Sequence, residues 1–231
     1  MTLTNPEVAA LVLSLKTALF SLICILPPGI GIGWLLAKAS FRGKSVLSTV
    51  VMLPLVLPPV VSGYLLLLVF SRYGPIGGVL YRLFGLELIF SWVAVVLAIS
   101  VISFPLMVRS IVISMEEVDS QLERVARTLG ASPLKVFFTI TLPLSYRGIV
   151  SGIILAFARS LGEFGATIMV AGNIPGKTQT LPLAIFNYIQ TGREASVYRL
   201  VFLSTVIAFG TLWLAEKRYL NPNSVSIQMK N

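Results

Sequence analysis

Residues 124–143, with the sequence RVARTLGASPLKVFFTITLP, decide how this chain is organised because they interrupt its long apolar runs. A capping-box spacing precedes this segment, with Ser120 followed by Glu123. It predicts the start of a short polar helix. Ser132 and Pro133 have the residue types of an N-cap and a first helical position, so a second helix is expected to begin there. The segment is therefore predicted to be a compact hook of two helices.

The first helix of this hook has one apolar face. Leu122, Val125 and Leu129 recur at helical spacing, and Gly130 follows where a left-handed C-cap is needed. A helix of about ten residues is marginal by itself in water. It therefore has to dock against the rest of the bundle, in the groove of a partner or flat on a membrane surface, and the spacing alone leaves these interpretations open.

The composition indicates a membrane protein. Apolar residues make up 56% of the chain, charged residues only 12%, and the mean hydropathy is +0.90. The net charge of +9 comes from short loops between apolar runs, without the basic stripe and interleaved aromatics of a nucleic-acid-binding protein. With one cysteine, Cys24, and no histidine, the sequence excludes an internal disulfide and a Cys/His zinc site, and no metal site is expected. We expect the first apolar run to be a span rather than a cleaved signal.

Five stretches are apolar and long enough to cross a bilayer core of about 30 Å, which needs about 20 helical residues. They are expected at residues 11–37, 45–71, 88–112, 148–171 and 197–215. The hook lies in a loop of about residues 116–143, and two further segments, 74–87 and 172–195, are predicted to form outer loops with short helices. The predicted fold class is an all-α integral membrane protein with five transmembrane helices, in which residues 1–231 form one domain.

The orientation follows from the positive charges of short loops, which favour the cytoplasmic side. With the N-terminus outside, eleven Lys and Arg residues fall in the cytoplasm and five outside. The cytoplasmic set is Lys38, Arg42, Lys44, Arg109, Arg124, Arg127, Lys135, Arg147, Lys217, Arg218 and Lys230. The outer set is Arg72, Arg82, Lys177, Arg193 and Arg199. We therefore expect the N-terminus outside and the C-terminus in the cytoplasm, with the cytoplasmic hook between spans 3 and 4.

Three of the five predicted spans contain prolines, which remove backbone donors and bend or break helices. These residues are Pro27, Pro28, Pro54, Pro58, Pro59 and Pro105. In a bilayer, such breaks persist only where neighbouring helices or a water-filled path satisfy the freed carbonyls. The prolines thus favour a bundle around a pathway, with packing kinks in a purely structural bundle as the alternative.

The hook resembles the EAA loop of binding-protein-dependent ABC importer permeases. Gly130, Ile140 and the pair Leu142-Pro143 match the family pattern in residue and spacing. Arg124-Val125-Ala126 stands where the family has Glu-Ala-Ala, and Glu123 lies one place earlier.

By this resemblance, the hook is a coupling helix that sits in a cleft of an ATPase subunit. The resemblance implies that Leu129, Gly130 and Ala131 lie at the contact, with Glu123 and Arg127 at its rim. Pro143, which ends the matching motif, is assigned to the same coupling element.

Longer strings resemble the permeases of molybdate/tungstate importers. They are LPLVLPPVVSG (53–63), SFPLMVR (103–109), ARTLG (126–130) and AFARSLGEFGAT (156–167). The resemblance covers about residues 10–218, and sulfate/thiosulfate permeases share much of the last string.

The resemblance implies a permease subunit that imports molybdate or tungstate across the bacterial plasma (inner) membrane. The alternatives are a sulfate/thiosulfate permease and a passive anion channel. The implied partners are two ABC ATPase subunits, an external oxyanion-binding protein, a second copy of the chain and the lipid bilayer. ATP and Mg are expected on the ATPase, because Gly43-Lys44-Ser45 lacks the earlier glycine of a phosphate-binding loop. No catalytic residues are expected, and no cofactor is expected on this chain.

Arg159 and Glu163 lie four residues apart in the fourth predicted span, so they share one helix face and are able to pair. Ionisable groups within a span are costly and usually face the interior of a bundle. Either Arg159 gives a path a positive field for a divalent oxyanion, or the pair locks helix packing. Ser62 and Ser103 are further candidates for lining the path.

Overall fold

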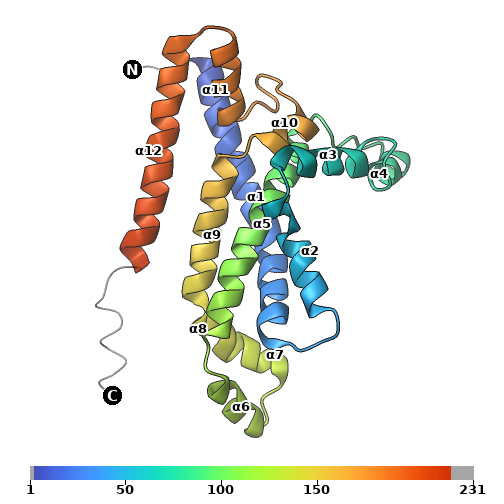
Figure 1. Ribbon diagram of the computed structural model, residues 1–231, viewed down its shortest axis with the longest axis vertical. Coiled ribbons are helices and arrows are strands. Elements are labelled where there is room, and N and C mark those ends of the chain that lie inside the picture. The colour runs from blue at the N-terminus through green and yellow to red at the C-terminus, as the bar shows by residue number, and fades with distance from the viewer. Residues whose placement is uncertain (1–2, 220–231) are drawn as a thin grey trace.

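The computed structural model describes residues 3–219, with side chains up to Trp213, and over this range it is all-helical (Figure 1). The helices are α1 (Asn5–Lys38), α2 (Lys44–Val56), α3 (Pro59–Phe70), α4 (Gly77–Phe84), α5 (Trp92–Glu116), α6 (Ser120–Thr128), α7 (Pro133–Val136), the π-helical turn η1 (Phe137–Thr141), α8 (Leu142–Leu144), α9 (Tyr146–Leu161), α10 (Gly165–Ala171), α11 (Leu181–Gln190) and α12 (Glu194–Tyr219). Lys230, and the side chains of Lys217 and Arg218, lie outside the described residues, so their part in the orientation stays a prediction.

Three long helices, α1, α5 and α9, run side by side and form the core of the bundle (Figure 1). Met107, Ile111 and Met115 on α5 are fully buried between α1 and α9. Lipid tails are as apolar as leucine, so helices in a membrane associate mainly through close packing at small residues. At Gly33 on α1, an added Cβ would lie 2.5 Å from Ile111 Cγ2, and at Gly148 on α9 it would overlap Ser114. Glycine therefore permits both contacts of α5.

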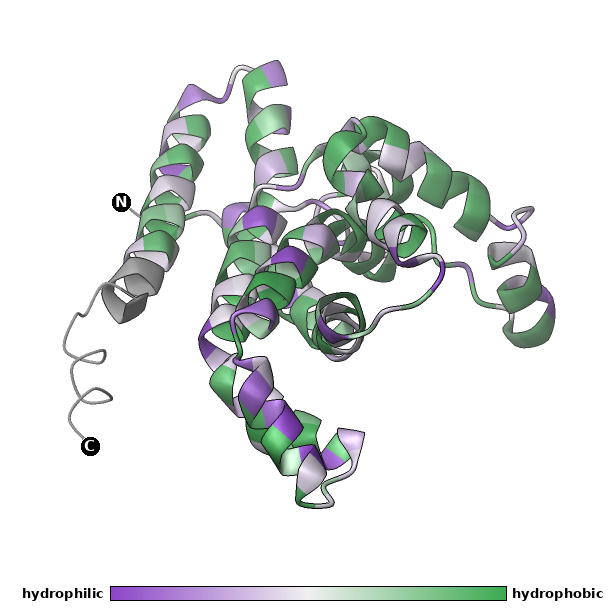
Figure 2. Ribbon diagram, turned by 60° about the horizontal axis from the view of Figure 1, so that its bottom comes forward, coloured by the Kyte–Doolittle hydropathy of each residue, from purple (hydrophilic) through white to green (hydrophobic). Residues whose placement is uncertain are grey.

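Among the described residues, three helices are long and apolar enough to cross a membrane: α1, α5 and α12. The number rises to five if each of two bent helix pairs counts as one span. Figure 2 shows the hydrophobic residues that dominate these helices and the near-uniform apolar character of α3. The structure thus supports an all-α fold with three to five spans.

Pro58 and Pro59 interrupt the second predicted span, residues 45–71, as expected from the sequence. The chain bends by 114° between α2 and α3. Leu57 is extended, as expected before a proline, and neither Pro58 nor Pro59 has an N–H to continue the helix. In contrast, Pro27, Pro28 and Pro105 lie inside the uninterrupted helices α1 and α5, so the predicted break at those prolines does not occur.

The fourth predicted span, 148–171, is also interrupted. Helix α9 ends at Leu161, and α10 begins only at Gly165. Glu163 stands in the gap, where its Oε1 accepts a hydrogen bond of 2.8 Å from the N–H of Ala166 in the first turn of α10. The carboxylate thus satisfies a backbone donor at the new helix start.

The short helices of the two predicted outer loops are confirmed. Helix α4 projects from the body beyond α3 (Figure 1). Helix α11 packs between α1 and α12, where Leu183, Ala184 and Tyr188 are buried, rather than lying over the surface. An ion pair of 2.7 Å between Glu7 and Arg199 joins α1 to α12 at the same end of the bundle.

We expect the substitution Gly33→Leu to lower the thermal stability of the purified protein by several degrees. The added side chain overlaps Ile111, and overpacking of this kind costs about 1–3 kcal/mol. Gly31→Leu is the matched control, because a Cβ there meets nothing within 4 Å. Equal melting temperatures for the two variants in detergent would contradict the described packing of α1 against α5.

Candidate functional site

The hook begins with a cap that differs from the predicted one. Asp119, not Ser120, is the N-cap of α6, and its side chain accepts a hydrogen bond of 2.8 Å from the N–H of Gln121. Glu123 therefore has no part in a capping box, and the predicted start of this helix is wrong by one residue.

The end of α6 is as expected. Gly130 has a φ of 88°, and its N–H donates to the carbonyl of Arg127, while Ala131 N–H donates to Ala126 at 3.0 Å. These two bonds form a Schellman motif, which suits glycine at the left-handed position. Ser132 then accepts a hydrogen bond from the N–H of Lys135 as N-cap of α7, with a proline in the first turn. The chain continues through η1 and α8 and bends by 67° into α9.

Glu123 is turned into the body of the protein and is only 7% exposed. Its Oε1 accepts a hydrogen bond of 2.6 Å from the hydroxyl of Thr141 in η1. The same oxygen lies 3.3 Å from Nζ of Lys38, the last residue of α1, and Lys38 also donates to the carbonyl of Val118 at 2.9 Å. The Lys38–Glu123–Thr141 cluster thus ties the hook to the end of α1 and the approach to α9.

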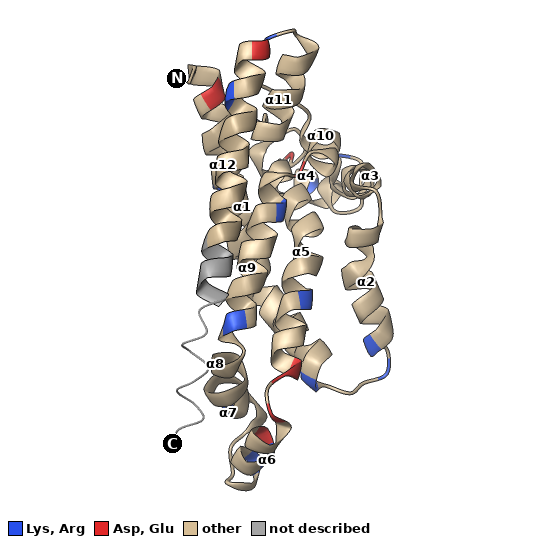
Figure 3. Cartoon of the chain, turned by 60° about the vertical axis from the view of Figure 1, so that its left-hand side comes forward, with Lys and Arg blue, Asp and Glu red and all other residues tan. Residues whose placement is uncertain are grey.

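The opposite face of α6 is apolar and exposed. Leu122, Val125 and Leu129 all point away from the body, and Leu129 is 83% exposed. A short helix with a buried carboxylate and an exposed aliphatic stripe is inverted relative to ordinary soluble helices, and such patches mark contact surfaces. Helix α6 projects beyond the ends of the long helices (Figures 1 and 3).

The other residues assigned to the coupling element are placed as follows. Arg127 and Gly130 are exposed at the tip of the hook beside Leu129, and Ala131 is half-buried. Pro143 is exposed on α8, apart from α6 in the chain. The structure therefore brings four of these residues together at the tip, while Glu123 faces the body.

Arg159 and Glu163 form the predicted ion pair. Nη2 of Arg159 lies 2.7 Å from Oε2 of Glu163, whose side chain is only 1% exposed. Because Glu163 also binds the N–H of Ala166, the pair joins the end of α9 to the start of α10. This arrangement neutralises Arg159 within the chain.

Ser62 and Ser103 are both enclosed by protein. Ser103 shares a hydrogen bond of 3.0 Å with Ser160 of α9, and neither hydroxyl is exposed. The Ser62 hydroxyl is buried on α3 without a hydrogen-bond partner among the described residues. Neither serine faces an open path in this conformation, and their assignment to the path stays a prediction.

The sequence was compared with known proteins. A family model described as "Binding-protein-dependent transport system inner membrane component" matches residues 29–222. The chain belongs to this family.

The chain is similar to known permeases in sequence and to ABC transporter chains in fold. The chain is 53% identical to the "Molybdenum transport system permease protein ModB" of Escherichia coli K12, over 94% of this chain and 95% of that protein. The fold resembles a chain of the inward-facing MetNI methionine ABC transporter, with a TM-score of 0.71 at 16% identity over 93% and 97% of the two chains. It also resembles a chain of a bacterial alginate ABC transporter solved with its pentasaccharide-bound periplasmic protein, with a TM-score of 0.73 at 14% identity over 94% and 81%. The chain is thus a multi-pass inner membrane component with an ABC permease fold.

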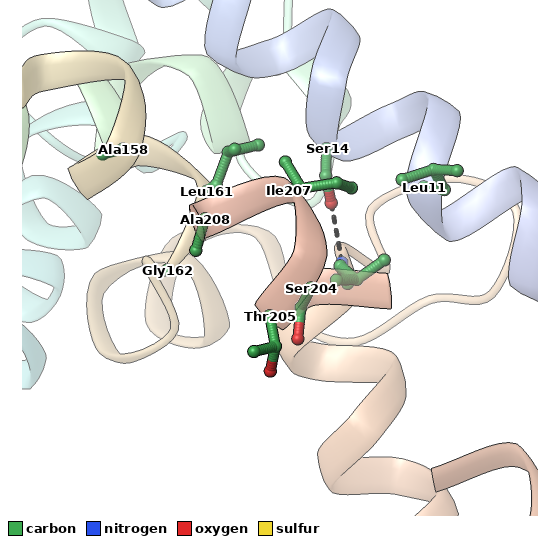
Figure 4. Close-up of a pocket in the computed structure, with 10 residues that line it drawn as sticks. Leu11, Ser14, Ala158, Leu161, Gly162, Ser204, Thr205, Ile207 and Ala208 are labelled. Atoms are coloured by element: carbon green, nitrogen blue, oxygen red, sulfur yellow. Dashed lines mark hydrogen bonds between the residues drawn. The ribbon is translucent and has the colours of Figure 1, made fainter. Parts of the chain in front are cut away.

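A cavity of about 280 Å³ lies between α1, α9, α11 and α12 in this permease fold (Figure 4). Its ten lining residues include Leu11, Leu161 and Ile207, and none of the ten is charged. The hydroxyl of Ser14 at its edge already accepts a hydrogen bond of 2.7 Å from the N–H of Leu181, the dashed line in Figure 4. This uncharged and mainly apolar lining gives no indication of an oxyanion site. The described part of the chain also has no group of three or more potential metal ligands.

Sequence reasoning missed the Lys38–Glu123–Thr141 cluster. Lys38 was counted only as a positive charge of a short loop, and Thr141 was given no role. The signal for this cluster was the position of Glu123 in α6. It is the acidic residue on the buried side of this short helix, whose apolar residues face outward.

We expect Glu123→Gln to loosen the hook. The amide keeps a hydrogen bond to Thr141 but leaves Lys38 without its counter-ion, and removing one partner of a buried pair costs about 3–5 kcal/mol at most. The expected result is faster limited proteolysis within residues 116–143 of the purified protein. Glu116→Gln is the control, since this glutamate is exposed at the end of α5. Equal cleavage rates in the two variants would show that the cluster does not hold the hook.

Proposed function

We propose that this chain is the permease subunit of an ATP-driven importer of molybdate or tungstate. The observation that carries the proposal is the exposed apolar stripe of α6, held outward by the buried Glu123. A channel that opens passively has no need of such a stripe at the end of a rigid hook.

The stripe fits the surface groove of a soluble partner better than a membrane surface. Helix α6 projects past the ends of α1 and α5, and exposed aliphatic residues continue from Leu129 to Leu134 beyond the glycine turn. A helix lying flat on lipid would present one continuous apolar side, whereas this hook presents its apolar residues around a tip. We infer that the partner is an ABC ATPase, and that Leu129, Gly130 and Ala131 make the contact, with Arg127 at its rim.

The wider assembly follows from the same proposal. Two copies of the chain line a path at their interface, two ATPases dock beneath the hooks, and an external binding protein delivers the oxyanion. ATP and Mg bind the ATPases, so this chain carries no catalytic residue. We further propose five spans, with each bent helix pair as one, and an orientation with the N-terminus outside.

The mechanism requires that motion of the hook reaches the spans. Glu123 connects α6 to α1 through Lys38 and to η1 through Thr141, and η1 leads through α8 into α9. When ATP closes the two ATPases, the hooks approach each other, and α1 and α9 move with them. This motion opens the outer end of the path to the loaded binding protein, and ATP hydrolysis restores the inward-open state.

The Arg159–Glu163 pair has a packing role in this proposal. Its geometry supports this role, because Glu163 is buried and bonded both to Arg159 and to the start of α10. We expect Arg159→Gln to reduce the amount of assembled complex on size-exclusion chromatography. A variant that assembles normally but imports no substrate would instead assign Arg159 to the path.

The substrate class rests on the 53% identity to the E. coli molybdenum permease over nearly the whole chain. Sulfate or thiosulfate is the second candidate, because part of the α9–α10 sequence is shared with those permeases. We expect deletion of this chain to abolish high-affinity uptake of labelled molybdate, with uptake in the parent cells blocked by tungstate but not by excess sulfate.

Two other results of this uptake experiment are informative. Unchanged molybdate uptake with impaired sulfate uptake would move the substrate to sulfate and keep the permease. No change in either would contradict the proposed function.

A further inference from the structure

Arg109, counted above among the cytoplasmic charges, lies within a candidate membrane span and is unpaired there within the described part of the chain. It lies on α5, its side chain is exposed, and it makes no ion pair or hydrogen bond with any described residue. Three other basic residues of the long helices, Lys38, Arg159 and Arg199, each pair with a glutamate. An isolated arginine in a span is costly unless it faces water, a partner or a ligand. The charge of Arg109 therefore requires water, a partner chain or a ligand, because no described group of the single chain pairs with it.

The direction of the Arg109 side chain makes it unfavourable for the guanidinium to reach the water at the nearby membrane surface. Arg109 lies seven residues before the end of α5 at Glu116, a rise of about 10 Å. In a helix, the Cα–Cβ bonds tilt toward the N-terminus. The Arg109 side chain therefore leans into the span, away from the charged end that leads to the hook.

A groove of about 300 Å³, with several polar side chains in its lining, lies between α5 and α9 at the same end of the bundle. Its lining residues are Ser110, Ile113, Ser114, Glu117, Arg147, Gly148 and Ser151. Ser110 and Ser114 donate hydrogen bonds to the carbonyls of α9 and its N-cap, at 2.9 and 3.0 Å, which fixes the polar wall. Arg109 does not itself line the groove, but Ile113, one turn further along the same face of α5, does, so Arg109 lies about one helical turn beyond the groove in the direction of the span.

The facing side of α9 is polar as well. Arg147, Ser151, Leu155 and Arg159 follow at intervals of four residues and share one face, and all four are exposed or half-buried. The Ser151 hydroxyl makes no hydrogen bond to any described residue. Figure 3 shows Lys and Arg on both α5 and α9 within the length of the bundle.

The outer face of α12 is apolar, as is typical of a surface that contacts lipid. Between Leu200 and Trp213 it carries no charged residue, and Phe202, Val206 and Phe209 are exposed. The contrast between the two faces indicates that the surface with Arg109 and Ser151 lines an aqueous path, whereas α12 contacts lipid.

We propose that Arg109 binds the oxyanion during transit, and that the groove with Ser151 and Arg147 is its exit toward the hook end of the path. This inference rests on the proposed function. A guanidinium donates two parallel hydrogen bonds to two oxygens of a tetrahedral anion, which a lysine cannot reproduce. A contact from one unpaired arginine in each copy, with Glu117 at the mouth of the groove, keeps binding weak enough for release.

The first test is transport by the complete complex in proteoliposomes with its ATPase and binding protein. We expect Arg109→Gln to lower molybdate uptake at least tenfold, while the ATP hydrolysis stimulated by loaded binding protein persists. Arg109→Lys should restore part of the uptake, and Arg42→Gln, at an exposed loop arginine, should have no effect.

Two results would overturn the inference: wild-type uptake by Arg109→Gln, or loss of both uptake and complex assembly. Failure of the unsubstituted complex to import molybdate would instead contradict the proposed function, whatever Arg109 does.

The second test measures exposure to water and is independent of transport. With Cys24→Ser removing the single native cysteine, Arg109→Cys and Val206→Cys are treated from the cytoplasmic side with a charged, membrane-impermeant thiol reagent. Position 109 should react, and molybdate should slow the reaction, whereas position 206 should not react. Absence of reaction at 109, or reaction at a rate that molybdate leaves unchanged, would place Arg109 outside the oxyanion path.

Discussion

The buried contact of Glu123 with Lys38 and Thr141 determines which side of α6 faces outward. A carboxylate removed from water requires compensation, and this one has a lysine and a hydroxyl within hydrogen-bonding distance. Because the polar side of α6 is used in this way, the aliphatic residues have no place in the body and remain exposed. The surface that we assign to the ATPase is thus a consequence of an internal ion pair.

Ion pairs between buried or half-buried charges also connect helices in the rest of the membrane domain. Lys38, Arg159 and Arg199 are each neutralised at a junction between helices: α1 with the hook, α9 with α10, and α1 with α12. The glycines of α1 and α9 allow close contact with α5, so the paired charges sit on a rigid frame. Arg109 stands out against this pattern, which is why we connect it with the substrate rather than with the fold.

Much of this architecture was predictable from the sequence. Apolar length located α1, α5 and α12, the three helices long and apolar enough to cross a membrane among the described residues, and Gly130 with Ser132 and Pro133 predicted the turn of the hook, because each residue type suits one local backbone geometry. The interruption after Leu161 was not predicted, since the spacing of Arg159 and Glu163 fits an unbroken helix, whereas Glu163 in fact binds the N–H of Ala166 at the start of a new one.

The other differences have the same origin. Pro105 remains helical where neighbouring helices bury it, and Pro27 and Pro28 stay within α1 although they are exposed, whereas Pro58 and Pro59 together leave no donor to continue α2. The inward position of Glu123 depends on Lys38, which lies 85 residues away in the chain. Local spacing carries no information on such a pairing, so the inward position of Glu123 could not be predicted from the sequence.

Photo-cross-linking from the tip of the hook tests the central claim most directly. A benzophenone is attached at Leu129→Cys in the Cys24→Ser chain and irradiated in membranes that contain the whole importer. The account predicts a cross-linked product of this chain with the ATPase subunit, and none from the same probe at Ser120, which is exposed on the opposite side of α6. Cross-links to lipid alone would show that the hook lies on the membrane, and would contradict its role in coupling.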